Sequence, residues 1–146
     1  MIAIASDHGG FALKQELMAQ LKKDGIAFED LGTYTEESCD YPAYAEKVCR
    51  GVVAGTYEKC ILVCGTGIGM SMAANKIRGI RCALCSDCFS AEMTRRHNNS
   101  NVIALGGRTL GVELAIRIMK IFLDTPFDGG RHQRRVDQMM ALEDKI

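Results

Sequence analysis

Short apolar segments alternate with longer segments of helical period, and this alternation constrains the fold more than any other feature of the chain. The apolar runs are 2–6, 26–32, 59–65, 80–86 and 101–107. The segments expected to be helical are 11–23, 41–55, 69–77, 89–99, 110–124 and 131–145. Alternation of this kind predicts a single α/β domain over 1–146, with an open, mostly parallel sheet and helices on both faces.

Two segments show the periods clearly. Leu13, Leu17 and Leu21 recur at i, i+4 and i+8 between polar residues, which indicates an amphipathic helix. Residues 59–65 read KCILVCG, a continuous apolar run typical of a strand that is buried on both faces of a parallel sheet. Five such strands favour either a flavodoxin-like strand order or a half-Rossmann arrangement.

Charge and cysteine usage exclude several classes of function. The formal net charge is zero, so no global field attracts nucleic acid or a membrane surface. No apolar run approaches ~18 residues, and the opening MIAIASDHGG predicts a strand and not a signal peptide. Seven cysteines without an export signal indicate reduced thiols, and we therefore expect a cytoplasmic protein.

Polar and glycine residues follow the apolar runs where a parallel sheet binds its ligands. They are Asp7, His8, Gly9 and Gly10 after the first run, 64–69 after the third, Ser86 and Asp87 after the fourth, and Gly106, Gly107 and Arg108 after the fifth. Ligands of open α/β sheets bind beyond the carboxyl ends of the strands. We therefore expect a ligand at this edge of the sheet.

The glycine-rich segment CGTGIGM at 64–70 matches neither common nucleotide motif. Met70 stands one position after Gly69, where the dinucleotide pattern needs its next glycine, and no Gly-Lys-Ser/Thr follows. The segment is either a tight strand-to-helix turn or a loop whose backbone N–H groups bind an anion. Asp87, 18 residues after Gly69, keeps a nucleotide hypothesis open.

The cysteines divide into two kinds. Cys82, Cys85 and Cys88 have spacing typical of iron–sulfur proteins, but the fourth ligand is missing, and Cys82 and Cys85 should face opposite sides of a strand. Buried, unreactive thiols are the favoured interpretation. Cys64 differs because it ends a strand at the start of a helix, where thiolates are favoured. It could act as nucleophile, redox centre or general base.

The last helix begins with Arg131, His132, Arg134 and Arg135, although cations at a helix N-terminus oppose the helix dipole. Such a violation often marks a site, and Arg131 and Arg135 at i and i+4 can reach one anion. A solvated basic patch is the alternative. His97 ends an earlier helix and could be only a partner of its dipole. Together with His8 and Cys64, these residues suggest a small-phosphate site with acid–base groups.

Taken together, these residues make the sequence resemble the type B ribose-5-phosphate isomerases, a family that also includes allose-6-phosphate and galactose-6-phosphate isomerases. The motifs that carry the resemblance are SDHGG at 6–10, DYP at 40–42, CGTGIGMSMAANK at 64–76, HNNSN at 97–101, GGR at 106–108 and GGRHQRRV at 129–136. The resemblance spans essentially the whole chain. It implies a three-layer flavodoxin-like (Rossmann-like) fold with strand order 2-1-3-4-5, a homodimer or tetramer, and no metal or organic cofactor.

The resemblance also implies a role for each matching residue. Cys64 would be the base that moves a proton between carbons 2 and 1 of the open-chain sugar. The amides of Gly65, Thr66, Gly67, Ile68 and Gly69, together with the Thr66 side chain, would hold the enediolate. His97, assisted by Asp7, would open the furanose ring, and Asn98 would contact the substrate. His8, Arg108, Arg131 and Arg135 would bind the phosphate, the last two from a partner subunit onto which the C-terminal helix packs.

The implied activity is interconversion of D-ribose 5-phosphate and D-ribulose 5-phosphate in non-oxidative pentose phosphate metabolism. Within the family, serine at the cysteine position is paired with a glutamate at the position of Met70, so Met70 leaves Cys64 as the base. A six-carbon sugar phosphate, allose 6-phosphate or galactose 6-phosphate, is the alternative substrate. A nucleotide- or flavin-binding module is a more distant alternative.

Overall fold

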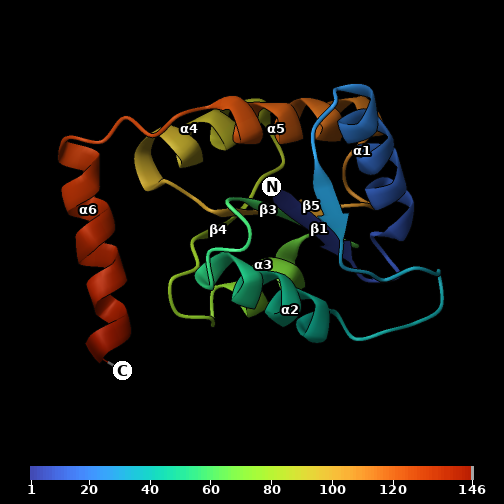
Figure 1. Ribbon diagram of the computed structural model, residues 1–146, viewed down its shortest axis with the longest axis horizontal. Helices are drawn as coiled ribbons and strands as arrows, with labels where there is room; N and C mark the ends of the chain where they lie inside the picture. The colour runs from blue at the N-terminus through green and yellow to red at the C-terminus, as the bar shows by residue number, and fades with distance from the viewer. Residues whose placement is uncertain (146) are drawn as a thin grey trace.

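The computed structural model describes residues 1–145 as three layers, with one sheet between two helical layers (Figure 1). The strands are β1 (Ile2–Ser6), β2 (Phe28–Asp30), β3 (Cys60–Cys64), β4 (Cys82–Leu84) and β5 (Val102–Gly106), and all pair in parallel. The helices are α1 (Phe11–Lys23), α2 (Tyr41–Val53), α3 (Ile68–Ala74), α4 (Cys88–Asn98), α5 (Val112–Asp124) and α6 (Arg131–Met140), followed by a 3₁₀ turn, η1 (Ala141–Lys145). The predicted fold class is confirmed.

The predicted strand order is wrong in its last two strands. The sheet runs β2-β1-β3-β5-β4, so β5 and not β4 lies beside β3. All five residues of β5 are buried, which suits an interior strand, whereas β4 has three half-buried or exposed residues. Short strands are commonly placed at sheet edges. The exchange matters for the site because it sets Cys64 directly opposite Gly106.

Two apolar clusters hold the layers together, one on each face of the sheet. Helices α1, α4 and α5 cover one face, where Ile61 and Val63 of β3 point. Helices α2 and α3 cover the other face, which receives Leu62 and Cys64. Alternation along β3 therefore directs the Cys64 side chain toward α3, the helix that follows it.

The cysteine spacing at 82–88 has a structural explanation. Cys82 and Cys85 lie in the clusters on opposite faces of the sheet, as predicted. All seven cysteines are free, and Cys82, Cys85 and Cys88 form no metal-ligand group within residues 1–145. Burial raises the pKa of both Cys49 and Cys60 to about 12, so these thiols stay protonated.

Asp87 has a structural role at the start of α4. It is the N-cap of α4, and its carboxylate accepts hydrogen bonds from the Ser90 N–H at 2.7 Å and the Ser90 hydroxyl at 2.8 Å. These bonds lower the pKa of Asp87. A ribose-binding role is therefore not needed to explain this acid.

Helix α6 stands at one end of the molecule, beyond β4, and packs on α4 (Figure 1). The 3₁₀ turn η1, which follows α6, packs on the loop between α3 and β4. There, Arg78 Nη1 donates to the Glu143 carbonyl at 2.7 Å and the Gly79 N–H donates to Glu143 Oε1 at 3.0 Å. Of the apolar side chains on α6, Val136 is buried while Met139 is 40% exposed. Among residues 1–145, no helix is both long and apolar enough to cross a membrane.

Candidate active site

Cys64 is the last residue of β3, and its thiol is held by the loop that follows. The Gly67 N–H donates to Cys64 Sγ at 3.1 Å, and the sulfur is almost fully buried. Gly67 has φ +79°, and a Cβ there would lie 2.6 Å from a Leu84 methyl and 3.0 Å from the Leu105 carbonyl carbon. Only glycine therefore lets the chain turn from β3 into α3 while directing an amide at the thiol.

The loop after β5 closes over the loop after β3. The Gly107 N–H donates to the Cys64 carbonyl at 2.7 Å, and the Arg108 N–H donates to the Gly65 carbonyl at 2.8 Å. The Arg108 guanidinium consequently lies beside Gly65, 3.3 Å from where a Cβ would stand. Thr66 is exposed at the top of the loop, and its hydroxyl accepts a hydrogen bond from the Ile68 N–H at 3.2 Å.

The loop after β1 completes this group. Asp7 is 7% exposed, and its Oδ1 accepts a hydrogen bond from the Gly10 N–H at 3.1 Å. His8 Nδ1 accepts a hydrogen bond from the Cys39 N–H at 3.2 Å, so a neutral His8 ring carries its proton on Nε2 and offers a donor there. A Cβ on Gly9 would lie 3.1 Å from the Gly65 nitrogen, so the two loops touch. The term thiol group denotes this set of residues, Asp7, His8, the 64–69 loop and Arg108, and the –SH of the cysteine is called the Cys64 thiol.

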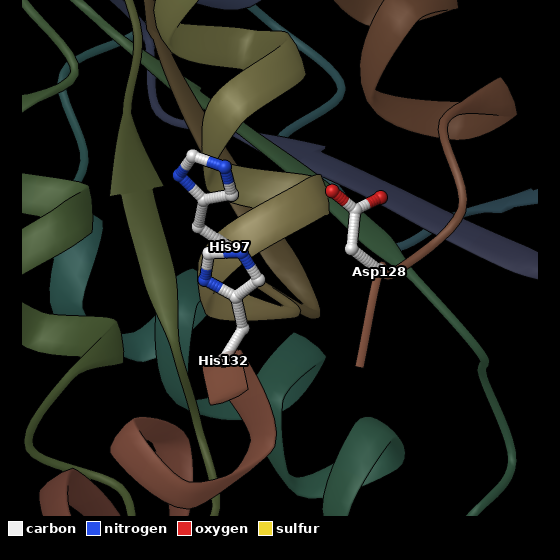
Figure 2. Close-up of side chains that lie close together, drawn as sticks. All are labelled: His97, Asp128 and His132. Atoms are coloured by element: carbon white, nitrogen blue, oxygen red, sulfur yellow. The ribbon is translucent and has the colours of Figure 1, made fainter. Parts of the chain in front are cut away.

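The remaining candidate residues gather elsewhere. A cavity of about 480 Å³ between α4 and α6 is lined by His97, Asn98, Arg131, His132, Arg135, Val136 and Met139. The His97 and His132 rings stack, with centroids 4.2 Å apart and planes 9° apart (Figure 2). We call His97, Asn98, Arg131 and Arg135 the arginine group.

The fold separates the two groups. Helix α4 begins beyond the carboxyl end of β4 and runs back for eleven residues, about 16 Å, so His97 and Asn98 lie toward the amino ends of the strands. Cys64 lies at the carboxyl end of β3. A single chain therefore does not bring all the candidate residues to one edge of the sheet, because His97 ends its helix and does not follow a strand.

His97, Asp128 and His132 offer ligand atoms within 4.8 Å of one another, as a metal site would (Figure 2). Three features disfavour a cation there. The stacked rings are nearly parallel, so their lone pairs lie in two parallel planes, whereas a shared metal needs the lone pairs to converge on one point. The Asp128 carboxylate is already paired with Arg96 at 3.1 Å. Arg131 and Arg135 line the same cavity, which suits an anion better.

Two residues without an assigned role in the sequence interpretation adjoin these groups. His132 stacks on His97, and burial, then His97 and then Arg131 lower the pKa of His132. The Tyr41 ring packs over the loop, where a Cβ on Gly69 would lie 2.8 Å from it. His132 lies in the motif GGRHQRRV and Tyr41 in the motif DYP, so membership in these motifs is the sequence feature that could have indicated both residues.

Comparison with known proteins covers nearly the whole chain. The chain is 46% identical over 144 residues to ribose-5-phosphate isomerase B of Escherichia coli, covering 99% of this chain and 97% of that protein. A solved ribose-5-phosphate isomerase B of Clostridium thermocellum is 46% identical, with TM-score 0.97 over 99% of this chain and 97% of that one. That of Mycoplasma genitalium, solved with ribulose-5-phosphate bound, is 39% identical with TM-score 0.93, covering 99% of this chain and 97% of that one. The model of the Ribose/Galactose Isomerase family matches residues 2–139, and the chain belongs to this family.

Proposed function

We propose that the protein interconverts D-ribose 5-phosphate and D-ribulose 5-phosphate. The observation that carries the proposal is the buried Cys64 thiol, held by a loop amide at the carboxyl edge of the sheet and bordered by Arg108. The names of the whole-chain relatives support the substrate. The seven free cysteines support a cytoplasmic location. The proposed activity would place the protein in pentose phosphate metabolism.

In the proposed reaction, the Cys64 thiolate removes the proton on carbon 2 of open-chain ribose 5-phosphate. The electron pair of that C–H bond forms the C1=C2 double bond, and the former aldehyde oxygen becomes the negative oxygen of the enediolate. The proton of the carbon 2 hydroxyl then passes to the oxygen on carbon 1, the Cys64 thiol returns its proton to carbon 1, and the carbonyl forms at carbon 2. Of the amides of 65–69, that of Gly67 already donates to Cys64 Sγ and that of Ile68 to the Thr66 hydroxyl oxygen. The amides of Gly65, Thr66 and Gly69, with the proton of the exposed Thr66 hydroxyl, are therefore the donors assigned to the negative oxygen. Preorganised donors of this kind contribute much of the barrier lowering in such sites.

Ring opening and phosphate binding are assigned to the remaining residues. His97, assisted by Asp7, transfers protons between the ring oxygen and the anomeric hydroxyl, and Asn98 contacts the sugar. His8 Nε2–H and Arg108 hold the phosphate from the thiol group, while Arg131 and Arg135 hold it from the arginine group. No metal or organic cofactor is required by these steps.

The separation of the two groups in one chain favours a site shared between two copies of the chain. Large apolar side chains are exposed around α3, β4 and α6: Ile68, Met72, Leu84, Phe89, Met139 and Leu142. Exposed apolar patches commonly mark subunit interfaces. We therefore propose at least a homodimer in which the thiol group of one subunit meets the arginine group of the other.

Substitution Cys64→Ala tests the function. We expect kcat for ribose 5-phosphate to fall by about 10²–10⁴-fold, because a positioned base contributes roughly that factor. Binding of ribose 5-phosphate, measured by calorimetry, should change little. Cys49→Ala, another buried thiol on the same face of the sheet, is the control and should leave kcat nearly unchanged.

Substantial activity in Cys64→Ala would refute the assignment of the base. The same assay with allose 6-phosphate and galactose 6-phosphate tests the substrate. A higher kcat/KM for either six-carbon sugar phosphate would replace ribose 5-phosphate in the proposal.

A further inference from the structure

A second cationic cavity lies at the amino edge of the sheet, away from Cys64. Its volume is about 300 Å³, and Lys59, Arg81 and Arg95 contribute three positive charges to its lining. Lys59 directly precedes β3, Arg81 directly precedes β4, and Arg95 lies in the last turn of α4. No step of the proposed reaction uses these three side chains.

The three cations are bonded to carbonyl oxygens and not to carboxylates. Lys59 Nζ donates to the Leu123 carbonyl at 2.7 Å, Arg81 Nη2 to the Asn99 carbonyl at 2.9 Å, and Arg95 Nη1 to the Ser100 carbonyl at 2.6 Å. Within residues 1–145, none of the three forms an ion pair within 4.0 Å. Their charges are therefore solvated by carbonyl oxygens and are not paired directly with carboxylates.

A charge count leaves the cavity positive. The C-terminal ends of α4 and α5 each contribute about −0.5 charge, and Glu58, an exposed residue in the lining, contributes one full negative charge. Against the three cations of the lining, roughly one positive charge remains within the cavity. Outside the lining, Asp124 attracts Lys59 and Glu143 attracts Arg81. Burial first, and then repulsion by the neighbouring cation, lower the pKa of Lys59 and of Arg95, while Glu58 opposes this shift at both residues.

We propose that this cavity is a binding site for a small multivalent anion of the phosphate class. The Lys59 ammonium has three N–H donors and uses one on Leu123, so two can turn toward a ligand. Within residues 1–145, Arg95 Nη2 makes no hydrogen bond and can donate to a phosphate oxygen, whereas Arg81 contributes mainly its charge because its Nε, Nη1 and Nη2 already donate to other groups. A bound dianion would relieve the repulsion among the cations, and the volume accommodates a phosphate group with room for a short organic chain.

An anion in this cavity would bind beside residues of the arginine group. Arg81 Nε donates to the Asn98 carbonyl at 3.2 Å, and Arg95 lies two residues before His97 on α4. The site is nevertheless separate from the arginine group, since Arg131 and Arg135 line the other cavity. The anion site does not depend on the proposed function.

Titration of ¹⁵N-labelled protein with inorganic phosphate at constant ionic strength tests the site. We expect saturable shifts of the amides of Arg81, Asn99, Ser100 and Asn101, beside this cavity. Phosphate bound at the proposed active site would instead shift the 64–69 amides and the start of α6. The two binding events are thus separately observed, and one can fail without the other.

Three variants test which charged side chains govern phosphate binding at this cavity. Lys59→Gln should weaken phosphate binding at this cavity about tenfold, because it removes one charge-assisted hydrogen bond. Glu58→Gln should tighten it, because it removes the negative charge from the lining. Lys47→Gln, an exposed lysine on α2 outside the cavity, should change nothing.

The proposal is overturned if the 99–101 amides do not move, or if chloride moves them equally. It is also overturned if Lys59→Gln and Glu58→Gln both bind phosphate there with wild-type affinity. Glycerol 3-phosphate as a second probe distinguishes a site for free phosphate from a site for a phosphate ester.

Discussion

The thiol group and the arginine group are built in different ways. Around Cys64, positions are set by backbone hydrogen bonds between loops that follow buried strands, and glycines allow the close approach. Around Arg131 and Arg135, exposed side chains project from a helix that stands at the edge of the molecule (Figure 1). Proton transfer between carbons 1 and 2 by Cys64 requires fixed geometry, whereas the contacts of Arg131 and Arg135 with a phosphate require reach. The difference suggests that the rigid half of the site lies within one subunit and the adaptable half is completed on assembly.

Mixing inactive variants gives the largest expected effect. Cys64→Ala and His97→Ala homodimers should each lose about 10²–10⁴-fold in kcat. If the site is shared across a dimer, exchanging subunits between equal amounts of the two should restore about a quarter of wild-type activity, since about half the dimers are mixed and each has one intact site.

A matched pair controls this experiment. Cys64→Ala mixed with Asp7→Asn combines two defects of the thiol group, so every mixed dimer has two damaged sites and no recovery is expected. Recovery in that pair, or none in the first pair after verified subunit exchange, would mean that the two groups do not meet across a dimer.

Replacing the arginines tests whether they act on the phosphate. Arg131→Gln and Arg135→Gln should each raise KM for ribose 5-phosphate about 10–100-fold, because each removes a charge-assisted contact with the phosphate. Arg134→Gln, which removes an exposed arginine of the same helix that does not line the cavity, should leave KM nearly unchanged. An equal effect at all three positions would indicate general electrostatic attraction.

How far the sequence predicts the molecule follows the same division. That Asp7, the 64–69 loop and Arg108 lie together could be predicted, because each directly follows an apolar run and the carboxyl ends of parallel strands meet at one sheet edge. Strand order could not, because β4 and β5 both have apolar residues and their difference in burial appears only after packing. The separation of His97 from Cys64 was not predicted, although the expected helix 89–99 places His97 at its C-terminal end, because the spatial path of that helix relative to β3 appears only in the folded structure.

A glycine in each region sharpens the contrast in rigidity. Gly67→Ala should lower the free energy of unfolding by about 2–4 kcal/mol. The added Cβ would clash with Leu84 and Leu105, and alanine is also strained at φ +79°. Gly129→Ala, at φ +67° before α6 and with no atom within 4 Å of the added Cβ, should cost only about 1 kcal/mol. Urea denaturation measures both. Equal costs would mean that the tight packing around the thiol group adds nothing to the backbone strain.

The smallest expected effect concerns His132 and pH. Because the pKa of His132 is lowered in the folded protein, the unfolded state binds its proton more readily than the folded state. The contribution of His132 to stability is therefore complete above its unfolded pKa of about 6.5, and it is lost as pH falls through the lower folded value. His132→Gln should reduce the drop in urea midpoint between about pH 7.5 and pH 5.5. The midpoints at the higher pH serve as the reference, since His132 is neutral there in both states, and an unchanged or steeper drop in the variant would show that stacking on His97 does not disfavour the charged ring.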